Sequence, residues 1–277
     1  MAVRMTTRIG RRPNNTPAYG LAVGSTSIAV QAYYRMDDRT VWGTSGIFDS
    51  SGLSHPGNGV GTAYTNYQPG LLARSTNEGL KVPNQAAGGS IRIPQATWME
   101  SVAVSWAMCL QIPTAPPSDF CAPVTRRGSF TATPVPYAFY IASAANALAT
   151  PSGAVGACNA LISDSAGVYH WAAGTGVSIC DGKRHHVVFT TEIAMVNFTR
   201  VKCYLDGVLT GTADIAGPMP TGTAGSPSVA GSDITLGSEW SGSAYVRGLT
   251  GFMDEVAFWT GTLTQTDVTN LYNAFAL

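Results

Sequence analysis

Apolar and polar residues alternate with a period of two along two stretches near the end of the chain, 186–191 and 201–205. This period is typical of β-strands that are buried on one face. Asp206 and Gly207 follow the second stretch and favour the positive φ angles of a tight hairpin turn. Residues 208–212 are β-prone again, so that the pattern predicts an antiparallel hairpin. Further apolar, β-prone runs follow at 234–236 and 252–259.

The period changes from two to about 3.6 in the last residues of the chain. The apolar positions there are Val268, Leu271, Tyr272 and Phe275. This spacing places the four side chains on one face of a short helix. Thr264 followed by Asp267 resembles an N-terminal capping box. The pattern predicts a helix over 264–275.

The first half of the chain shows strand-like periodicity less regularly. Alternate residues are apolar from Val102 to Leu110, which predicts a long strand with one buried face. Residues 30–38 form an earlier β-prone run, and residues 49–57 are rich in Ser, Gly and Pro, as a turn requires. Strands separated by turns and closed by one helix indicate an all-β fold.

The order of these blocks resembles the laminin-G-like branch of the concanavalin A-like lectin/glucanase superfamily. The blocks that carry the resemblance are 30–38, 49–57, 102–110, 181–190, 201–212, 234–237, 251–259 and 263–272. The resemblance implies a concanavalin A-like β-sandwich, or jelly roll, with a short C-terminal helix. It also implies glycans as the ligand class, and it names no reaction. We expect the sandwich to span residues 28–277, preceded by an extended N-terminal arm over residues 1–27.

The composition indicates a globular protein. Charged residues make up 12% of the chain, hydrophobic residues make up 45%, and the formal net charge is zero. A chain without net charge has no general electrostatic attraction for nucleic acids. No apolar run reaches the length of a membrane span. We therefore expect neither nucleic-acid binding nor a membrane span.

The cations are unevenly distributed along the chain. Four arginines lie within the first twelve residues: Arg4, Arg8, Arg11 and Arg12. No acidic residue precedes Asp37. Ordering such a segment costs about 1–2 kcal/mol of backbone entropy per residue, so that we expect it to pack against a partner. The four arginines are then expected to contact neighbouring subunits in an assembly. The alternative is that the arm packs along its own sandwich.

The N-terminal residues lack the apolar core of a secretory signal peptide. Lectin-like sandwiches nevertheless usually act outside cells. A bacteriophage virion protein accounts for both the missing signal peptide and an extracellular role, because it is made in the host cytoplasm and released on lysis. We expect a non-enzymatic structural and adhesive protein, a head decoration or tail-associated protein. Its partners would be other virion proteins, further copies of itself and host surface glycans. The alternative is a free carbohydrate-binding module or a glycan-processing enzyme.

Catalysis on glycans requires carboxylates that converge. Retaining glycosidases place two of them about 5 Å apart, and related glucanases carry theirs in a Glu-x-Asp-x-x-Glu string, which is absent here. Asp254 and Glu255 are adjacent, and we expect neighbours in a strand to face opposite ways. The adjacent His185 and His186 should likewise be unable to share one metal. The sequence therefore predicts no catalytic residue.

Five cysteines show no metal-site spacing. We expect them to be free, buried thiols, because a free cysteine in a strand behaves as a small apolar residue.

Glycan binding uses aromatic platforms flanked by a few polar groups. The candidates are Trp240, Trp42, Tyr64 and Tyr67. The further available aromatic residues are Tyr33, Tyr34, Trp98 and Trp171. Trp106 and Trp259 alternate with apolar neighbours and are expected in the core. The alternative for Trp240 is that it fills the end of the sandwich.

Calcium is the possible cofactor that the resemblance implies, held by hard oxygen ligands at one rim. The candidate ligands are Asp37, Asp38, Asp254 and Asp49, because the opening and closing strands of such a sandwich tend to be neighbours. The alternative is that these aspartates cap turns by accepting hydrogen bonds from nearby backbone.

Overall fold

The fold is described from a computed structural model of the chain. The structure describes ten ranges of residues: 18–36, 47–60, 65–69, 78–82, 90–101, 103–126, 136–164, 168–195, 198–217 and 232–276. In the strands at 65–69 and 78–82, only the backbone is described.

Most elements in these ranges are strands. The helices are α1 (Ala18–Gly24), η2 (Thr97–Met99), η3 (Ala147–Ala149) and α2 (Gln265–Ala276). The strands of the first half are β1 (Val30–Tyr34), β2 (Asn58–Val60), β3 (Thr65–Pro69), β4 (Glu78–Val82), β5 (Ser90–Ile93), β6 (Val104–Gln111), β7 (Cys121–Arg126) and β8 (Tyr137–Ile141). Those of the second half are β9 (Cys158–Ser163), β10 (Tyr169–Gly174), β11 (Arg184–Met195), β12 (Phe198–Leu205), β13 (Val208–Ala216), β14 (Ile234–Leu236), β15 (Glu239–Trp240), β16 (Tyr245–Val246) and β17 (Gly251–Thr260).

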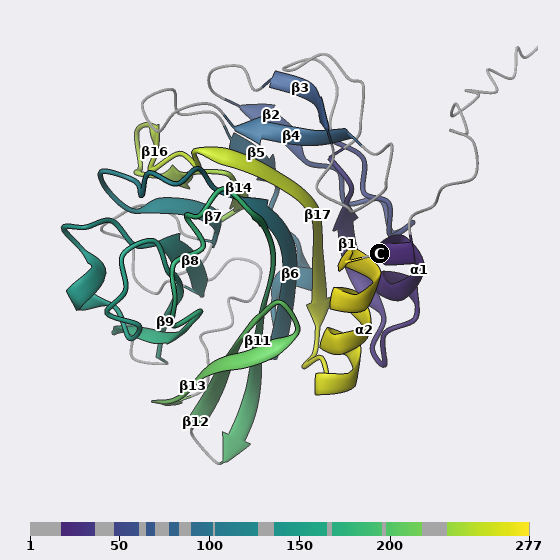
Figure 1. Cartoon of the computed structure of the whole chain (residues 1–277). Coiled ribbons are helices and arrows are strands. Elements are labelled where there is room, and N and C mark those ends of the chain that lie inside the picture. Colours follow the sequence, from purple (N-terminus) through teal and green to yellow (C-terminus); the bar gives the residue numbers. More distant parts are fainter. Residues whose placement is uncertain are drawn as a thin grey trace, which may run out of the picture.

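The described strands form a sandwich of two antiparallel sheets (Figure 1). The eight-stranded sheet has the order β13-β12-β11-β6-β17-β4-β3, and β1 also pairs with β17. The seven-stranded sheet has the order β10-β9-β8-β7-β14-β5-β2, and β15 and β16 form a separate hairpin. The opening strand β1 and the closing strand β17 are thus neighbours, as predicted. The predicted all-β sandwich is confirmed.

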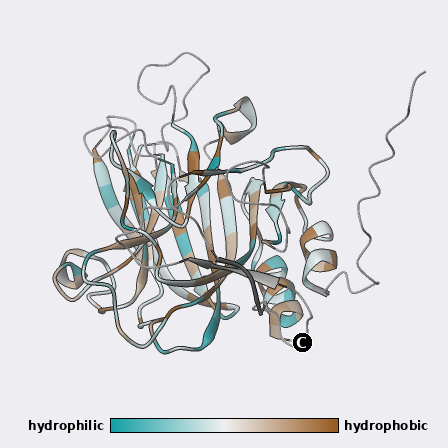
Figure 2. Cartoon of the chain, turned by 90° about the horizontal axis from the view of Figure 1, so that it is seen from above, coloured by the Kyte–Doolittle hydropathy of each residue, from teal (hydrophilic) through white to brown (hydrophobic). Residues whose placement is uncertain are grey.

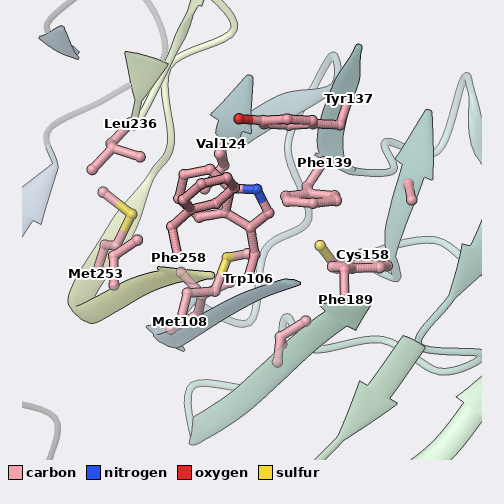
Figure 3. Close-up of a cluster of buried hydrophobic side chains, with 14 of the residues drawn as sticks. Trp106, Met108, Val124, Tyr137, Phe139, Cys158, Phe189, Leu236, Met253 and Phe258 are labelled. Carbon is pink, nitrogen blue, oxygen red and sulfur yellow. The ribbon is translucent and has the colours of Figure 1, made fainter. Parts of the chain in front are cut away.

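The core lies between the two sheets. Alternate residues of β6 point into it, so that Trp106 and Met108 pack there while Ala107 and Cys109 lie on the other face. The Phe139 and Phe189 rings join the two sheets, with centroids 4.4 Å apart and planes 6° apart (Figure 3). Hydrophobic and hydrophilic residues alternate along many strands (Figure 2), as two layers that bury one face each require.

The hairpin predicted at Asp206-Gly207 joins β12 to β13. Both residues have positive φ, 51° and 79°, as a tight turn with two left-handed residues requires. Gly207 is also needed for space, because a Cβ added there would lie 2.9 Å from the Tyr272 ring of α2. The turn therefore packs against the terminal helix.

The predicted C-terminal helix is α2. The Thr264 hydroxyl accepts a hydrogen bond from the backbone N–H of Asp267 (3.1 Å), and the Asp267 carboxylate accepts one from the N–H of Thr264 (2.9 Å). This reciprocal pair is the predicted capping box. Val268, Leu271 and Phe275 are buried against the sheet.

The prediction of an extended arm over residues 1–27 is wrong for residues 18–24, which form the helix α1. The helix lies beside α2 on the outer face of the eight-stranded sheet (Figure 1). Tyr19 and Val23 are buried in the apolar cluster that the two helices share with that face. Residues 18–27 pack along the chain's own sandwich, which is the alternative stated for the arm. Residues 1–17, including Arg4, Arg8, Arg11 and Arg12, lie outside the described residues.

All five cysteines are free and buried, as predicted. Burial raises the pKa of the Cys158 thiol well above its ordinary value, so that these side chains act as small apolar residues. No helix in the described part of the chain is long and apolar enough to cross a membrane.

Candidate functional site

A β-bulge in β17 changes the direction of its two acidic residues. Asp254 pairs with Cys109 of β6, whereas Ala257 pairs with Ala107, so that one extra residue is inserted between these pairs. Glu255 has a φ of 51°, a left-handed conformation that is uncommon for a residue with a side chain. Met253 and Val256 both point into the core. The bulge therefore directs Asp254 and Glu255 to the same outer face, and the expectation that they point to opposite faces is wrong.

These two acids lie in a polar network that the helices cover. Both are fully buried, and the Tyr33 hydroxyl donates a hydrogen bond to the Glu255 carboxylate. The Tyr19 hydroxyl of α1 lies 2.9 Å from Nε2 of His186. Burial raises the pKa of Tyr19 well above its ordinary value, and Asp254 and Glu255 raise it further. With α1 docked, the network is closed to a ligand.

The adjacent histidines have separate partners. Nδ1 of His185 lies 2.8 Å from the Asp206 carboxylate, and Nε2 lies 3.1 Å from the Asp181 carboxylate. His186 is buried between Tyr19 and the Phe275 ring. Among the described residues, no group of three or more His, Cys, Asp or Glu side chains is arranged to hold a metal ion.

Aromatic side chains gather instead on the outer face of the seven-stranded sheet. Tyr140 of β8 and Trp171 of β10 point outward, and Phe120 packs over them from just before β7. The Phe120 centroid lies 5.2 Å from that of Trp171 and 5.5 Å from that of Tyr140. Trp171 and Phe120 remain half-buried. Tyr169, two residues before Trp171 and on the same face of β10, is 55% exposed.

Arg247 lies over this aromatic group. Its Cζ atom is 5.6 Å from the Phe120 centroid and 5.8 Å from that of Tyr140, within the range of a cation–π interaction. The residue follows β16 and has a φ of 51°. Its carbonyl accepts a hydrogen bond from the N–H of Ala122 in β7 (2.9 Å). The β15–β16 hairpin is thereby fixed to the sheet, and the guanidinium is held above the rings.

Polar groups border the same rings. Nη1 of Arg247 lies 3.0 Å from the buried Glu239 carboxylate, and Nε lies 3.5 Å from that of Asp119. Asn146 donates a hydrogen bond to Asp119 (3.0 Å). We call the six residues the aromatic–arginine cluster: Asp119, Phe120, Tyr140, Asn146, Trp171 and Arg247. Planar apolar rings beside fixed donors and acceptors can bind a ring-shaped, hydroxyl-rich ligand.

The predicted glycan platform is only partly described. The Trp240 ring of β15 contacts that of Tyr245 in β16, with centroids 4.8 Å apart and planes tilted by 54°, and Trp240 remains half-buried. It sits on the hairpin that carries Glu239 and Arg247, beside the cluster rather than in it. Trp42 and Tyr64 lie outside the described residues, as does the side chain of Tyr67. A role of these residues in glycan binding stays a prediction.

Two of the four predicted calcium ligands, Asp49 and Asp254, lie in the described part of the chain. The Asp49 carboxylate accepts hydrogen bonds from the backbone N–H groups of Tyr33, Ser51 and His55, and thus caps a turn. Asp254 is buried and accepts a hydrogen bond from the N–H of Glu255. The turn-capping alternative thus describes Asp49. Asp37 and Asp38 lie outside the described residues, so that calcium binding there stays a prediction.

A surface cavity of about 410 Å³ lies beside the end of α2. Its lining residues are Gln111, Gly182, Lys183, Arg184, Phe275 and Ala276. None of the predicted site residues lines it.

Comparison with known proteins supports the fold. Residues 137–269 match the family model of the concanavalin A-like lectin/glucanases superfamily. No curated protein matches the sequence.

Solved structures resemble the sandwich at low sequence identity. Domain 4 of AbnA, an extracellular arabinanase from Geobacillus stearothermophilus in complex with arabinotriose, has a TM-score of 0.60 and 19% identity, over 88% of this chain and 98% of that one. The receptor binding domain of botulinum neurotoxin D has a TM-score of 0.55 and 9% identity, over 88% of this chain and 52% of that one. The binding domain of botulinum neurotoxin DC in complex with SialylT has a TM-score of 0.56 and 11% identity, over 89% of this chain and 51% of that one. The chain thus spans about half the length of the toxin structures. The two-sheet topology and the terminal helix agree with the match over residues 137–269, so that the chain has a concanavalin A-like sandwich fold.

Proposed function

We propose that this protein is a non-enzymatic glycan-binding protein and that the aromatic–arginine cluster is its binding site. The observation that carries the proposal is the group of three packed aromatic rings on an outer sheet face, bordered by Asp119, Asn146 and Arg247. A sugar ring has apolar faces that stack on Trp171, and hydroxyl groups that bond the bordering side chains. The rigid sheet holds the rings in place, so that little side-chain entropy is lost on binding.

The structural neighbours support the same ligand class. One is a domain in complex with arabinotriose, and another is a binding domain in complex with SialylT. Likeness of fold alone does not transfer a ligand to this chain. The proposal therefore rests on the cluster, and the neighbours add only that two domains of similar fold have been solved in such complexes.

We further propose that the protein serves as a structural and adhesive component of a bacteriophage particle, a head decoration or tail-associated protein. Residues 1–17 would attach it, with Arg4, Arg8, Arg11 and Arg12 contacting carboxylates of other virion proteins. The sandwich would then project its cluster toward host surface glycans, and several copies on one particle would raise the avidity. The support is the concentration of arginine before Asp37. Synthesis in the host cytoplasm belongs to the same proposal.

Replacement of Trp171 by alanine is expected to weaken glycan binding at least about tenfold, which corresponds to about 1.4 kcal/mol. The reason is that the indole supplies half-buried apolar area for a sugar face. The measurement is binding to a glycan array, followed by calorimetry with the best ligand. Trp171→Phe, which keeps an aromatic face, should lose less.

The matched control is Phe198→Ala. Phe198 is also a partly exposed aromatic residue, but it begins β12 in the other sheet. Its loss should leave binding unchanged. Trp240→Ala tests the neighbouring hairpin separately. A Trp171→Ala protein that keeps its melting temperature and full affinity would place the site elsewhere.

The absence of glycan hydrolysis is a separate expectation. Asp254 and Glu255 are an adjacent acidic pair on one face, but the docked α1 keeps substrate from them. We expect the purified protein to release no reducing ends from β-glucans, arabinans or related polysaccharides. Release that is lost in Glu255→Gln, while the variant stays folded, would support the alternative of a glycan-processing enzyme.

A further inference from the structure

We infer that the aromatic–arginine cluster selects uncharged saccharides and that Asp119 determines this selectivity. The inference rests on the proposed function and narrows its ligand class.

The charges at the cluster disfavour the binding of an acidic ligand. Arg247 is the cation of the cluster, and its guanidinium already lies beside two carboxylates, those of Glu239 and Asp119. Glu239 is completely buried, whereas the Asp119 side chain is 55% exposed. The Arg247 charge is thus shared between two carboxylates, and the most exposed of these three charged side chains is that of Asp119.

Asp119 is also held in a fixed position. Its Oδ1 accepts hydrogen bonds from the backbone N–H of Phe120 (2.7 Å) and from Nδ2 of Asn146 (3.0 Å). Asn146 is itself positioned by a 3.0 Å hydrogen bond to the Ser143 hydroxyl. A carboxylate fixed beside an aromatic ring is a ready acceptor for the hydroxyl protons of a sugar that stacks on that ring.

With an acidic sugar, the attraction between the ligand and the Asp119 carboxylate becomes a repulsion. The carboxylate of a sialic or uronic acid has no proton to donate at neutral pH, and it would be repelled by Asp119. Like charges placed together across an interface are a recognised source of discrimination between ligands. Because Asp119 is half exposed, water and salt weaken the repulsion. We therefore expect a preference of about tenfold rather than complete exclusion.

The test uses pairs of glycans that differ by one acidic residue, such as lactose and sialyllactose, and neutral and uronate-containing oligosaccharides of equal length. Binding is measured for the full chain, for Trp171→Ala and for Asp119→Asn, with melting temperatures as the control for folding. We expect each uncharged member to bind at least about tenfold more tightly than its charged partner at low salt. In Asp119→Asn, which keeps an acceptor but removes the charge, the preference should fall to about threefold or less.

The outcomes separate the two proposals. Trp171-dependent binding of charged glycans that is as tight as that of neutral ones would overturn the inference and leave the proposed function standing. A preference that is unchanged in Asp119→Asn would assign the selectivity to another group. If no glycan binds in a Trp171-dependent manner, the proposed function itself is contradicted, and the inference falls with it.

Discussion

Deletion of residues 1–26 is expected to destabilise the protein by about 5 kcal/mol or more, whereas deletion of residues 1–17 should leave its stability nearly unchanged. The longer deletion removes Tyr19 and Val23, which are buried in the cluster under the helices. Losing a large buried side chain costs about 2–5 kcal/mol. The deletion also removes Thr26, whose hydroxyl accepts a hydrogen bond from the Trp259 indole (3.0 Å).

The measurement is urea and thermal unfolding of the two truncated proteins and of the full chain. One kcal/mol corresponds to a shift of about 2–4 °C in a protein of 150–250 residues, so that the longer deletion should lower the melting temperature by more than 10 °C. Tyr19→Ala should reproduce a large part of the loss, and Tyr19→Phe only the part due to the hydrogen bond with His186. Equal stability of the two truncated proteins would show that α1 contributes nothing to the sandwich.

The same pair of deletions tests the proposed attachment. If residues 1–17 anchor the protein, the chain that begins at residue 18 should fold normally and fail to join the particle. If it is incorporated at normal occupancy, the attachment surface lies on the sandwich. The longer deletion does not serve this purpose, because loss of attachment and loss of folding would be confounded.

The sequence could predict β1, β6, β11 to β14, β17 and α2 because their signals are local. It contains no comparable signal for β7 to β10. The alternation in 186–191, the Asp206-Gly207 turn and the Thr264–Asp267 capping box each lie within a few neighbouring residues. The helix α1 has no such signal. It has seven residues, including two glycines, and no acid in its first turn. So short a helix is not stable alone and forms only by packing on the sheet, which sequence periodicity does not reveal.

The bulge and the aromatic–arginine cluster were missed for two further reasons. A period of two predicts opposite directions for Asp254 and Glu255, and a single inserted residue with positive φ reverses that conclusion. The cluster brings together side chains that are up to 128 positions apart, such as Asp119 and Arg247. The sequence shows Trp171 as one of several available aromatic residues. Its proximity to Phe120 and Arg247 depends on the order of the strands in the folded sheet.

Acidification from pH 7 to pH 4.5 is expected to weaken the docking of α1 through His186. Burial lowers the pKa of this imidazole from 6.5 to about 4. Between these two values the unfolded chain binds a proton at His186 and the folded chain does not, so that stability falls as the pH falls. The shift corresponds to about 2–3 kcal/mol lost by pH 4.5.

The contribution of His185 to stability depends on pH in the opposite direction, and it must be measured separately from that of His186. Its hydrogen bond with Asp206 raises its pKa above 6.5, so that its contribution to stability is present below pH 6.5 and is lost as the pH rises through the folded value. Unfolding free energies of the wild type, His186→Gln and His185→Gln should be compared from pH 4.5 to pH 7.5. The advantage of the wild type over His186→Gln should shrink toward low pH, and its advantage over His185→Gln should shrink toward high pH.

The two histidines can also be followed directly if a variant fails to fold. In a nuclear magnetic resonance titration of the native protein, the His186 ring should stay neutral until the pH approaches 4, while the His185 ring should protonate above 6.5. The neutral His186 can keep its contact with the Tyr19 hydroxyl, whereas a charged imidazole would be buried beside Phe275 without full compensation. Protonation is therefore expected to loosen α1 before the sandwich unfolds, seen as earlier hydrogen exchange in residues 18–24 than in β6 and β11. A His186 that titrates near 6.5 with α1 still protected from exchange would contradict this coupling between the buried imidazole and the helix.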